Sequence, residues 1–256
     1  MKWWCLLMTL ALAGACVTTP GVERPPPPAT PINAFHAPWR DARTALVIDA
    51  YEQNDINWSQ LANEPRVAGV IHRASSGLTA DRAYAARRTA AKSHGYLWGA
   101  YHVGTADDAG KQAALFLHTI GDAHGDLLAL DLEDVSSGKF MNMAQAQIFL
   151  EKVHMKTGRY PLVYVSHQTL LDICHTPSRS DIWARTRLWY ARYMDAITNF
   201  PSCDWRGYTL WQFASEQRPG TTRGAAFFPI PGTRPDIDVN VYPGTVQELR
   251  RAWPFE

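Results

Sequence analysis

The chain has 256 residues, of which 46% are hydrophobic and 19% are charged, and this length and composition suit a single α/β barrel with a sizeable core. Its formal net charge is +1, and removing a leader that carries one basic residue, Lys2, and no acid leaves equal numbers of basic and acidic side chains. Because the chain has no excess of basic residues, we expect no nucleic-acid partner.

The first fifteen residues predict an export signal. Lys2 precedes an apolar run from Trp3 to Ala13, and small residues follow this run, which is the order of segments in a secretory signal peptide. The run is shorter than the roughly 17–25 residues of an ordinary membrane-spanning helix. Cys16 follows the sequence Leu-Ala-Gly-Ala, which resembles a bacterial lipobox, so we expect residues 1–15 to be removed and Cys16 to be lipidated. The alternative is cleavage after Ala15 and release of a soluble protein.

Residues 16–43 predict a tether between this signal and a folded domain at residues 44–256. Seven of the 17 prolines lie between Pro20 and Pro38, and such a stretch adopts extended, semi-rigid conformations that bury little surface. Val17 differs from the aspartate that is often associated with retention of lipoproteins in the inner membrane. We therefore expect an outer-membrane lipoprotein that faces the periplasm, with a secreted or periplasmic protein as the alternative.

Short apolar runs in the domain predict a series of buried parallel strands. The first five runs are Ala45–Asp49, Val67–His72, Leu97–His102, Leu127–Glu133 and Pro161–Ser166. Amphipathic or alanine-rich segments between them predict three helices, each followed by a glycine that favours a helix end. These helices are expected at Asp81–Ser93, around Ala113–Ile120 and around Ala146–Val153.

Three further candidate strands follow residue 186, and the loops that join them lack a clear helical pattern. They are Leu188–Tyr193, Tyr208–Phe213 and Ile237–Val241. Eight strands, the first five followed by helices or helix-like links, predict a closed barrel with an irregular second half. An open doubly wound sheet is the alternative, although no glycine-rich phosphate loop supports a nucleotide site.

Four acidic residues are the candidate catalytic groups, because functional residues of a β/α barrel project from the carboxyl ends of its strands. Asp49 ends the first predicted strand, Asp131 and Glu133 end the fourth, and Asp238 lies in the eighth. The first and eighth strands are neighbours in a closed barrel. We therefore expect Asp49 and Asp238 to lie close together.

Asp131 and Glu133 form the most informative pair. Side chains two positions apart point to the same face of a strand, so both can face one cavity. Two close carboxylates cannot both ionise freely, and the less solvated one should have a raised pKa. A protonated carboxyl and an ionised partner are the groups that glycoside hydrolysis requires. The alternative is that these acids only anchor a loop through hydrogen bonds.

Seven segments together carry a resemblance to a known family. They are Asp49 with Ile56-Asn57-Trp58, Gly95–His102, Asp131-Leu132-Glu133, Tyr160–Tyr164, Leu188–Tyr193, Leu210-Trp211-Gln212 and Asp238-Val239-Asn240. In this order, over residues 45–242, they resemble the glycoside hydrolase family 25 lysozymes, the Chalaropsis-type muramidases.

This resemblance implies a modified TIM-like (β/α)5(β)3 barrel, with five β/α units followed by three strands. It implies hydrolysis of the β-1,4 bond between N-acetylmuramic acid and N-acetylglucosamine in peptidoglycan glycan strands, without a metal or a cofactor. By the same resemblance Glu133 is the proton donor, and Asp131 orients or stabilises the 2-acetamido group of the substrate, with direct nucleophilic attack as an alternative. Asp49 and Asp238 hold the substrate and tune the pKa of the acid.

Four aromatic residues near predicted strand ends are candidate sugar-binding residues. Flat rings at Tyr101, Tyr164, Tyr193 and Trp211 could stack on pyranose faces. The alternative for each is ordinary packing in the core or at the surface, since the chain has 10 Trp and 10 Tyr residues.

Cys174 and Cys203 remain after the leader and the lipidation site are set aside, and in an exported protein they could form a disulfide. A nucleophilic role for Cys174 beside His175 has little support, because a nucleophile and its base meet in space rather than in sequence.

Other activities find fewer signals in the sequence. The nine histidines include no His-Glu-x-x-His pair and there is no Gly-x-Ser-x-Gly segment, so a zinc hydrolase or a serine hydrolase is not expected. We expect a monomer. Two alternatives stay open: a non-catalytic, lipid-anchored barrel that binds the cell wall, and a barrel glycosidase that acts on chitin-like chains.

Overall fold

The computed structural model describes residues 1, 32–176, 180–215, 228–234 and 237–256. The predicted signal peptide, the predicted lipidation site Cys16 and most of the predicted tether therefore lie outside the described residues. The chain divides into two units, Met1–Pro31 and Ile32–Glu256, and all of the elements named below belong to the second. No helix within the described ranges is both long enough and apolar enough to cross a membrane.

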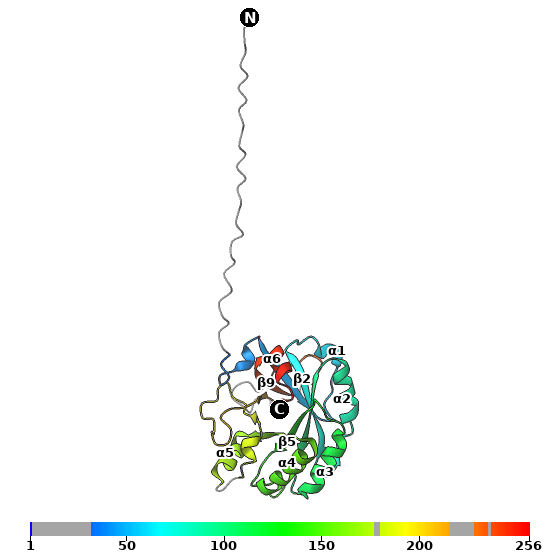
Figure 1. Cartoon of the computed structure of the whole chain (residues 1–256), viewed down its shortest axis with the longest axis vertical. Helices are drawn as coiled ribbons and strands as arrows, with labels where there is room; N and C mark the ends of the chain where they lie inside the picture. The colour runs from blue at the N-terminus through cyan, green and yellow to red at the C-terminus, as the bar shows by residue number, and fades with distance from the viewer. Residues whose placement is uncertain (2–31, 177–179, 216–227, 235–236) are drawn as a thin grey trace. The chain divides into compact units, whose positions relative to one another are not determined.

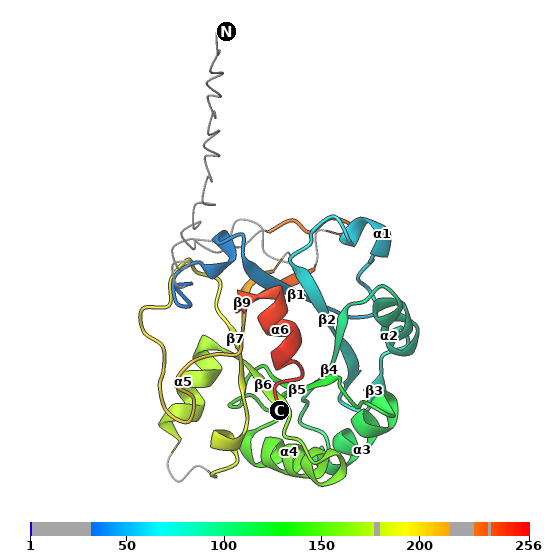
Figure 2. The same cartoon turned by 45° about the horizontal axis from the view of Figure 1, so that its top comes forward.

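In this part of the chain, eight strands form a closed barrel, which confirms the predicted strand number and closure (Figures 1 and 2). Hydrogen bonding runs in the order β1-β9-β8-β7-β6-β5-β4-β2, and the pairing of β1 with β2 closes the ring. The strands are β1 (Thr44–Ala50), β2 (Val67–Ser76), β4 (Leu97–Val103), β5 (Leu127–Leu132), β6 (Leu162–Ser166), β7 (Leu188–Ala191), β8 (Leu210–Ala214) and β9 (Asp238–Thr245). A two-residue strand, β3 (Thr79–Ala80), forms a hairpin with the end of β2.

The last strand runs opposite to the other seven barrel strands. Neighbouring strands from β1 through β2, β4, β5, β6 and β7 to β8 pair in parallel, whereas β9 pairs antiparallel with both β8 and β1. The amino end of β9 therefore lies at the same rim as the carboxyl ends of the others. Asp238, the first residue of β9, pairs with Asp49 near the end of β1.

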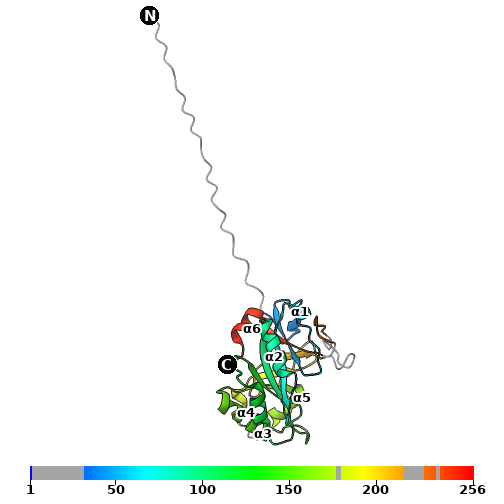
Figure 3. The same ribbon diagram turned by 90° about the vertical axis from the view of Figure 1, so that its right-hand side faces the viewer.

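Helices cover the outer side of the barrel (Figures 1 and 3). They are α1 (Trp58–Leu61), α2 (Tyr84–Ser93), α3 (Ala109–Ile120), α4 (Met143–Thr157) and α5 (His167–His175), with short 3₁₀ turns η1 (Pro38–Arg40) and η2 (Trp183–Arg185). The expected glycine stops are present, because Gly121 and Gly158 follow α3 and α4 with φ angles of 58° and 75°. Glycine enters this backbone region without the steric cost of a Cβ atom.

A further helix, α6 (Val246–Ala252), follows β9, where we expected loops without a helix. It begins with a capping box, in which the Glu248 amide donates to the Thr245 hydroxyl and the Thr245 amide donates to the Glu248 carboxylate. This Thr-x-x-Glu spacing is a helix-start signal that the sequence contains. Leu249 and Trp253 pack against side chains from the beginnings of the strands, so α6 closes the amino-terminal end of the barrel (Figure 2).

Alternation along the strands separates two layers of side chains. Inward-facing residues such as Val47 and Ala129 fill the barrel interior, whereas outward-facing residues such as Ile48 and Leu130 pack beneath the helices. This follows from the two-residue period of a strand. The direction of each side chain at the rim is therefore set by its parity in the strand.

Residues 32–43, which we had assigned to the tether, pack against the barrel. The ring of Trp39 is 3% exposed and stacks on the ring of Phe213, with a centroid separation of 4.3 Å and parallel planes to within 2°. The Ala37 amide also donates a hydrogen bond to the carbonyl of Asp195. Burial of this indole and of the adjacent Pro38 holds the end of this segment on the barrel.

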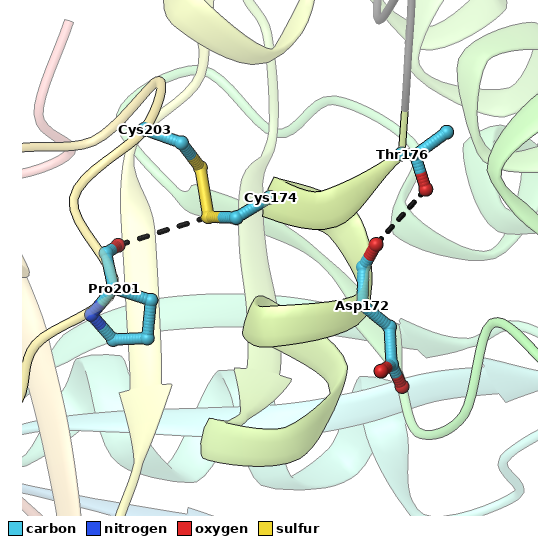
Figure 4. The surroundings of a disulfide bond; sticks show 5 residues. All are labelled: Asp172, Cys174, Thr176, Pro201 and Cys203. Carbon is cyan, nitrogen blue, oxygen red and sulfur yellow. Dashed lines mark hydrogen bonds between the residues drawn. A yellow bond between two sulfur atoms is a disulfide. The ribbon is translucent and has the colours of Figure 1, made fainter.

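Cys174 and Cys203 form a disulfide (Figure 4). Cys174 lies in the last turn of α5, and Cys203 lies in the long connection between β7 and β8. The bond closes a loop with a sequence separation of 29 residues. It therefore restricts a connection that contains no helix or strand between residues 192 and 209.

We expect replacement of both cysteines by serine to lower the free energy of unfolding by about 3–4 kcal/mol, because the unfolded chain regains the entropy of a loop of this length. Urea denaturation of the oxidised wild type and of the double variant measures the difference. Reduced wild-type protein is the control and should resemble the double variant. Equal stability of the oxidised and double-variant proteins would contradict a bond that restrains the unfolded chain.

Two buried histidines are held neutral between the barrel and its helices. The Nε2 of His102 donates to Gln112 Oε1 at 2.9 Å and its Nδ1 accepts from the Ser75 hydroxyl at 2.8 Å. His72 receives a hydrogen bond from Arg87 on Nε2 and donates from Nδ1 to a backbone carbonyl. Burial lowers the pKa of each histidine to about 4.

We expect stability to fall as the pH is lowered from about 6.5 towards 4. In this window the unfolded chain protonates these histidines and the folded chain does not, so each one removes about 1.4 kcal/mol of unfolding free energy per pH unit. Urea denaturation of wild type and His102→Gln at a series of pH values should show a smaller slope for the variant. His118→Gln, on the exposed face of α3, is the control, and an unchanged slope in His102→Gln would contradict the prediction.

Candidate active site

A cavity of about 710 Å³ lies at the rim where the carboxyl ends of the parallel strands meet the amino end of β9. Its lining combines acidic, aromatic and basic side chains. The residues that define its chemistry are Asp49, Tyr101, Asp131, Glu133, Tyr164, His167, Trp189, Arg192, Tyr193, Gln212 and Asp238.

The structure brings the four candidate acids into this one cavity. Asp49 and Asp238 are paired across β1 and β9. Asp131 lies in β5, and Glu133 follows directly after the end of that strand. Among the described residues, no group of three or more His, Cys, Asp or Glu side chains is arranged to hold a metal ion.

Gln212 joins the acids to two of the predicted aromatic residues. Its Nε2 donates to Asp49 Oδ2 at 3.1 Å and to Asp238 Oδ2 at 3.2 Å. Its Oε1 accepts hydrogen bonds from the hydroxyls of Tyr164 and Tyr193, at 2.8 and 2.6 Å. The side chain is 2% exposed, so this amide fixes two carboxylates and two phenols without direct contact with water.

Asn240 is a second amide that the acids use. Its Nδ2 donates to Asp49 Oδ2 at 2.7 Å, and its Oδ1 accepts from the indole of Trp189 at 2.6 Å. Our sequence analysis placed Gln212 and Asn240 in family-like segments without assigning either to the site. Strand alternation could have placed Asn240 at the site, because it lies two residues after Asp238 and so faces the same side of the strand.

The four acids differ in how deeply they are buried. Asp131 is 8% exposed, and among the described residues its Oδ1 has no hydrogen-bond partner. Burial, followed by the charges of Glu133, Asp49 and Asp238, raises the pKa of Asp131 well above its usual value. Burial also raises the pKa of Asp49 to about 6, against the hydrogen bonds from Asn240 and Gln212, which lower it. Glu133, by contrast, is exposed.

Three of the four predicted sugar-binding aromatics line the cavity, and Trp211 does not. Tyr101, Tyr164 and Tyr193 contribute to its wall. Trp211 is fully buried on the outer side of β8, where its indole packs edge-on against Trp39 with a centroid separation of 4.8 Å. The assignment of Trp211 was therefore wrong, because strand alternation turns it away from the face that Gln212 occupies.

Trp189, rather than Trp211, is the tryptophan that lines the cavity. It is 2% exposed and meets Tyr164 edge-on with a centroid separation of 4.9 Å. Trp189 faces the barrel interior, because successive residues of a strand face opposite sides and its neighbour Tyr190 packs in the outer core.

Comparisons with known proteins agree on one family. A family model described as Glycosyl hydrolases family 25 matches residues 48–221. The chain is 27% identical over 207 residues to a protein of Escherichia coli named uncharacterized protein YegX, a match that covers 77% of this chain and 69% of that protein.

Solved structures share the fold. A bacterial lysozyme from Streptomyces coelicolor is similar with a TM-score of 0.64 and 22% identity, over 80% of this chain and 95% of that one. A muramidase from Acremonium alcalophilum is similar with a TM-score of 0.62 and 24% identity, over 80% of this chain and 97% of that one.

We expect Gln212→Met to raise the pKa of Asp49 further, because the variant removes an amide donor that stabilises the carboxylate. The tyrosine hydroxyls and Asp49 also lose a buried partner, which should lower the free energy of unfolding by about 1–3 kcal/mol. Carboxyl-carbon NMR titration and urea denaturation measure the two effects. Gln147→Met is the control, because Gln147 lies on α4 outside this cavity and bonds to Glu151; an unchanged or lower Asp49 pKa in Gln212→Met would contradict the prediction.

Proposed function

The chain belongs to glycosyl hydrolase family 25, and we propose that it is a muramidase that hydrolyses the β-1,4 bond between N-acetylmuramic acid and N-acetylglucosamine in peptidoglycan. The observation that carries this proposal is the convergence of four carboxyl groups of unequal burial in one cavity. The similarity to proteins named lysozyme and muramidase supports it.

Glu133 donates the proton to the leaving glycosidic oxygen. A general acid must reach the atom that it protonates, and geometry comes before pKa in assigning this role. Glu133 is the exposed carboxyl beside Asp131, so its reach into the cavity suits contact with a bound sugar. Asp131 is deeper and has little exposed surface.

Asp131 and Glu133 share one proton, and substrate binding moves it. In the free protein burial favours the proton on Asp131, whose pKa is raised. The N–H of the substrate's 2-acetamido group supplies the partner that Asp131 Oδ1 lacks, and this hydrogen bond favours the ionised form of Asp131. The sugar covers Glu133 and excludes water from it, which disfavours the charged form of its carboxyl. The proton is then on the residue that can donate it.

Bond cleavage follows from this proton arrangement. The acetamido oxygen, oriented by the Asp131 carboxylate, attacks the anomeric carbon while the bond to the leaving oxygen breaks and Glu133 gives that oxygen its proton. Water then attacks the anomeric carbon and loses its proton to Glu133, while the bond from this carbon to the acetamido oxygen breaks; this restores both the acid and the acetamido group. Asp49 and Asp238 hold the sugar and stabilise positive charge on it.

Export places this activity at the envelope. The predicted signal at residues 1–15 directs the chain out of the cytoplasm, and Cys16 carries the lipid anchor to the outer membrane. The protein acts there as a monomer on glycan strands that face the periplasm, without a metal or a cofactor.

We expect the leaderless protein to release fragments with reducing N-acetylmuramic ends from purified peptidoglycan, as read by mass spectrometry of the products. Glu133→Gln should reduce the rate by about 10²–10⁴-fold, because the amide has no proton to donate. Glu151→Gln, an exposed glutamate on α4 that bonds to Gln147, makes the same chemical change outside the cavity and should keep full activity.

Two outcomes would replace this proposal. If neither wild type nor Glu133→Gln releases sugars but both bind sacculi, the barrel is a non-catalytic wall-binding protein. If chitin is cleaved and peptidoglycan is not, the substrate is a polymer of N-acetylglucosamine.

A further inference from the structure

The cavity contains a basic side chain as well as the four acids. Among the described residues that line it, Arg192 is the one lysine or arginine. Arg192 directly follows β7, and His167 directly follows the neighbouring strand β6. The two strand ends are paired at Ser166 and Ala191, so Arg192 and His167 project from adjacent positions of the rim.

One nitrogen of the Arg192 guanidinium, Nε, is buried without a hydrogen-bond partner among the described residues. The Nη2 of the same guanidinium lies 3.5 Å from Asn199 Oδ1, at the limit of a hydrogen bond. Within the described ranges no carboxylate forms an ion pair with it, whereas Arg73 on β2 pairs with Asp81. A buried guanidinium N–H without an acceptor is costly unless a ligand supplies one.

The neighbours of Arg192 favour an anion. His167 is the first residue of α5, and Ser166 is its N-cap, so the positive end of this nine-residue helix faces the same part of the cavity. The Nδ1 of His167 is hydrogen-bonded to the Tyr190 hydroxyl at 2.6 Å, which fixes the ring. Burial and the charge of Arg192 lower the pKa of His167, so Arg192 supplies the cationic charge.

We propose that Arg192 and the first turn of α5 form a carboxylate-binding subsite for the muramic residue of the substrate, an inference that rests on the proposed function. N-acetylmuramic acid differs from N-acetylglucosamine by a lactyl group, whose carboxyl is free in stem-free glycan. In glycan with peptide stems that carboxyl is an amide, and the stem carries carboxylates of its own. Either carboxylate, from the lactyl group or from the stem, can accept hydrogen bonds from the guanidinium of Arg192.

The three aspartates determine which way the muramic residue lies in the cavity. A substrate carboxylate placed beside Asp49, Asp131 and Asp238 would meet like charges in a poorly solvated cavity. The same carboxylate beside Arg192 meets a cation instead. Arg192 and the three aspartates together orient the muramic residue with its carboxylate towards α5. They also favour binding of peptidoglycan over uncharged chitin.

The test measures binding separately from cleavage. In the Glu133→Gln background, affinity is measured by calorimetry for three glycan oligosaccharides: one with peptide stems, one stem-free with free lactyl carboxylates, and one stem-free with those carboxyls converted to neutral amides. We expect a charged glycan to bind more tightly than the neutral one. Replacing Arg192 by Gln should weaken the charged complex about 10- to 100-fold and leave the neutral one unchanged.

Further variants distinguish a subsite from a structural role. Arg192→Lys keeps the charge without the fork and should retain part of the preference, and added salt should reduce it. Arg185→Gln is the matched control, because Arg185 is an exposed arginine paired with Asp181 outside this cavity. A preference seen with the stem-free acid assigns the lactyl carboxylate, and one seen with the stem-bearing glycan alone assigns the stem.

Equal affinity for charged and neutral glycans in the Arg192-containing protein overturns the subsite, as does an equal loss on both when Arg192 is replaced. If the wild type cleaves no glycan but this charge preference is present, the proposed hydrolysis fails and the subsite stands.

Discussion

The antiparallel course of β9 is the constraint on which the site depends. It brings the first residue of the last strand to the rim where the other strands end, and it pairs Asp238 with Asp49. Two facing carboxylates repel each other, and the amide of Gln212 offsets this repulsion by donating to both. Because the carbonyl of the same amide accepts from Tyr164 and Tyr193, one buried side chain determines the positions of both the acids and part of the aromatic wall.

The acids then differ in their chemical environment, because water reaches some of these carboxyl groups and not others. The barrel interior is closed at its far end by α6, so carboxyls that point inward lose contact with bulk water. Asp131 is buried with an unbonded oxygen and a raised pKa, while Glu133, only two residues further along, is exposed. One strand end thereby presents a buried carboxyl with a raised pKa beside an exposed carboxyl.

The part of the cavity that carries Arg192 and His167 is built from elements that are covalently linked. Cys174 at the end of α5 is bonded to Cys203 in the connection that follows β7. His167 begins that helix and Arg192 begins that connection, so the disulfide restrains both segments that carry the basic side of the cavity.

The sequence by itself determined the eight strands, the glycine ends of α3 and α4, the family, and the shared face of Asp131 and Glu133, because hydrophobic period, turn chemistry and strand parity are local properties. It also contained signals for α6 and for the outward direction of Trp211 that were overlooked. Only the tertiary structure decided the direction of β9, the unequal burial of the acids and the bridging position of Gln212. These depend on contacts between residues more than a hundred positions apart, such as Asp49 and Gln212, and on how much water the closed barrel excludes, which no local pattern encodes.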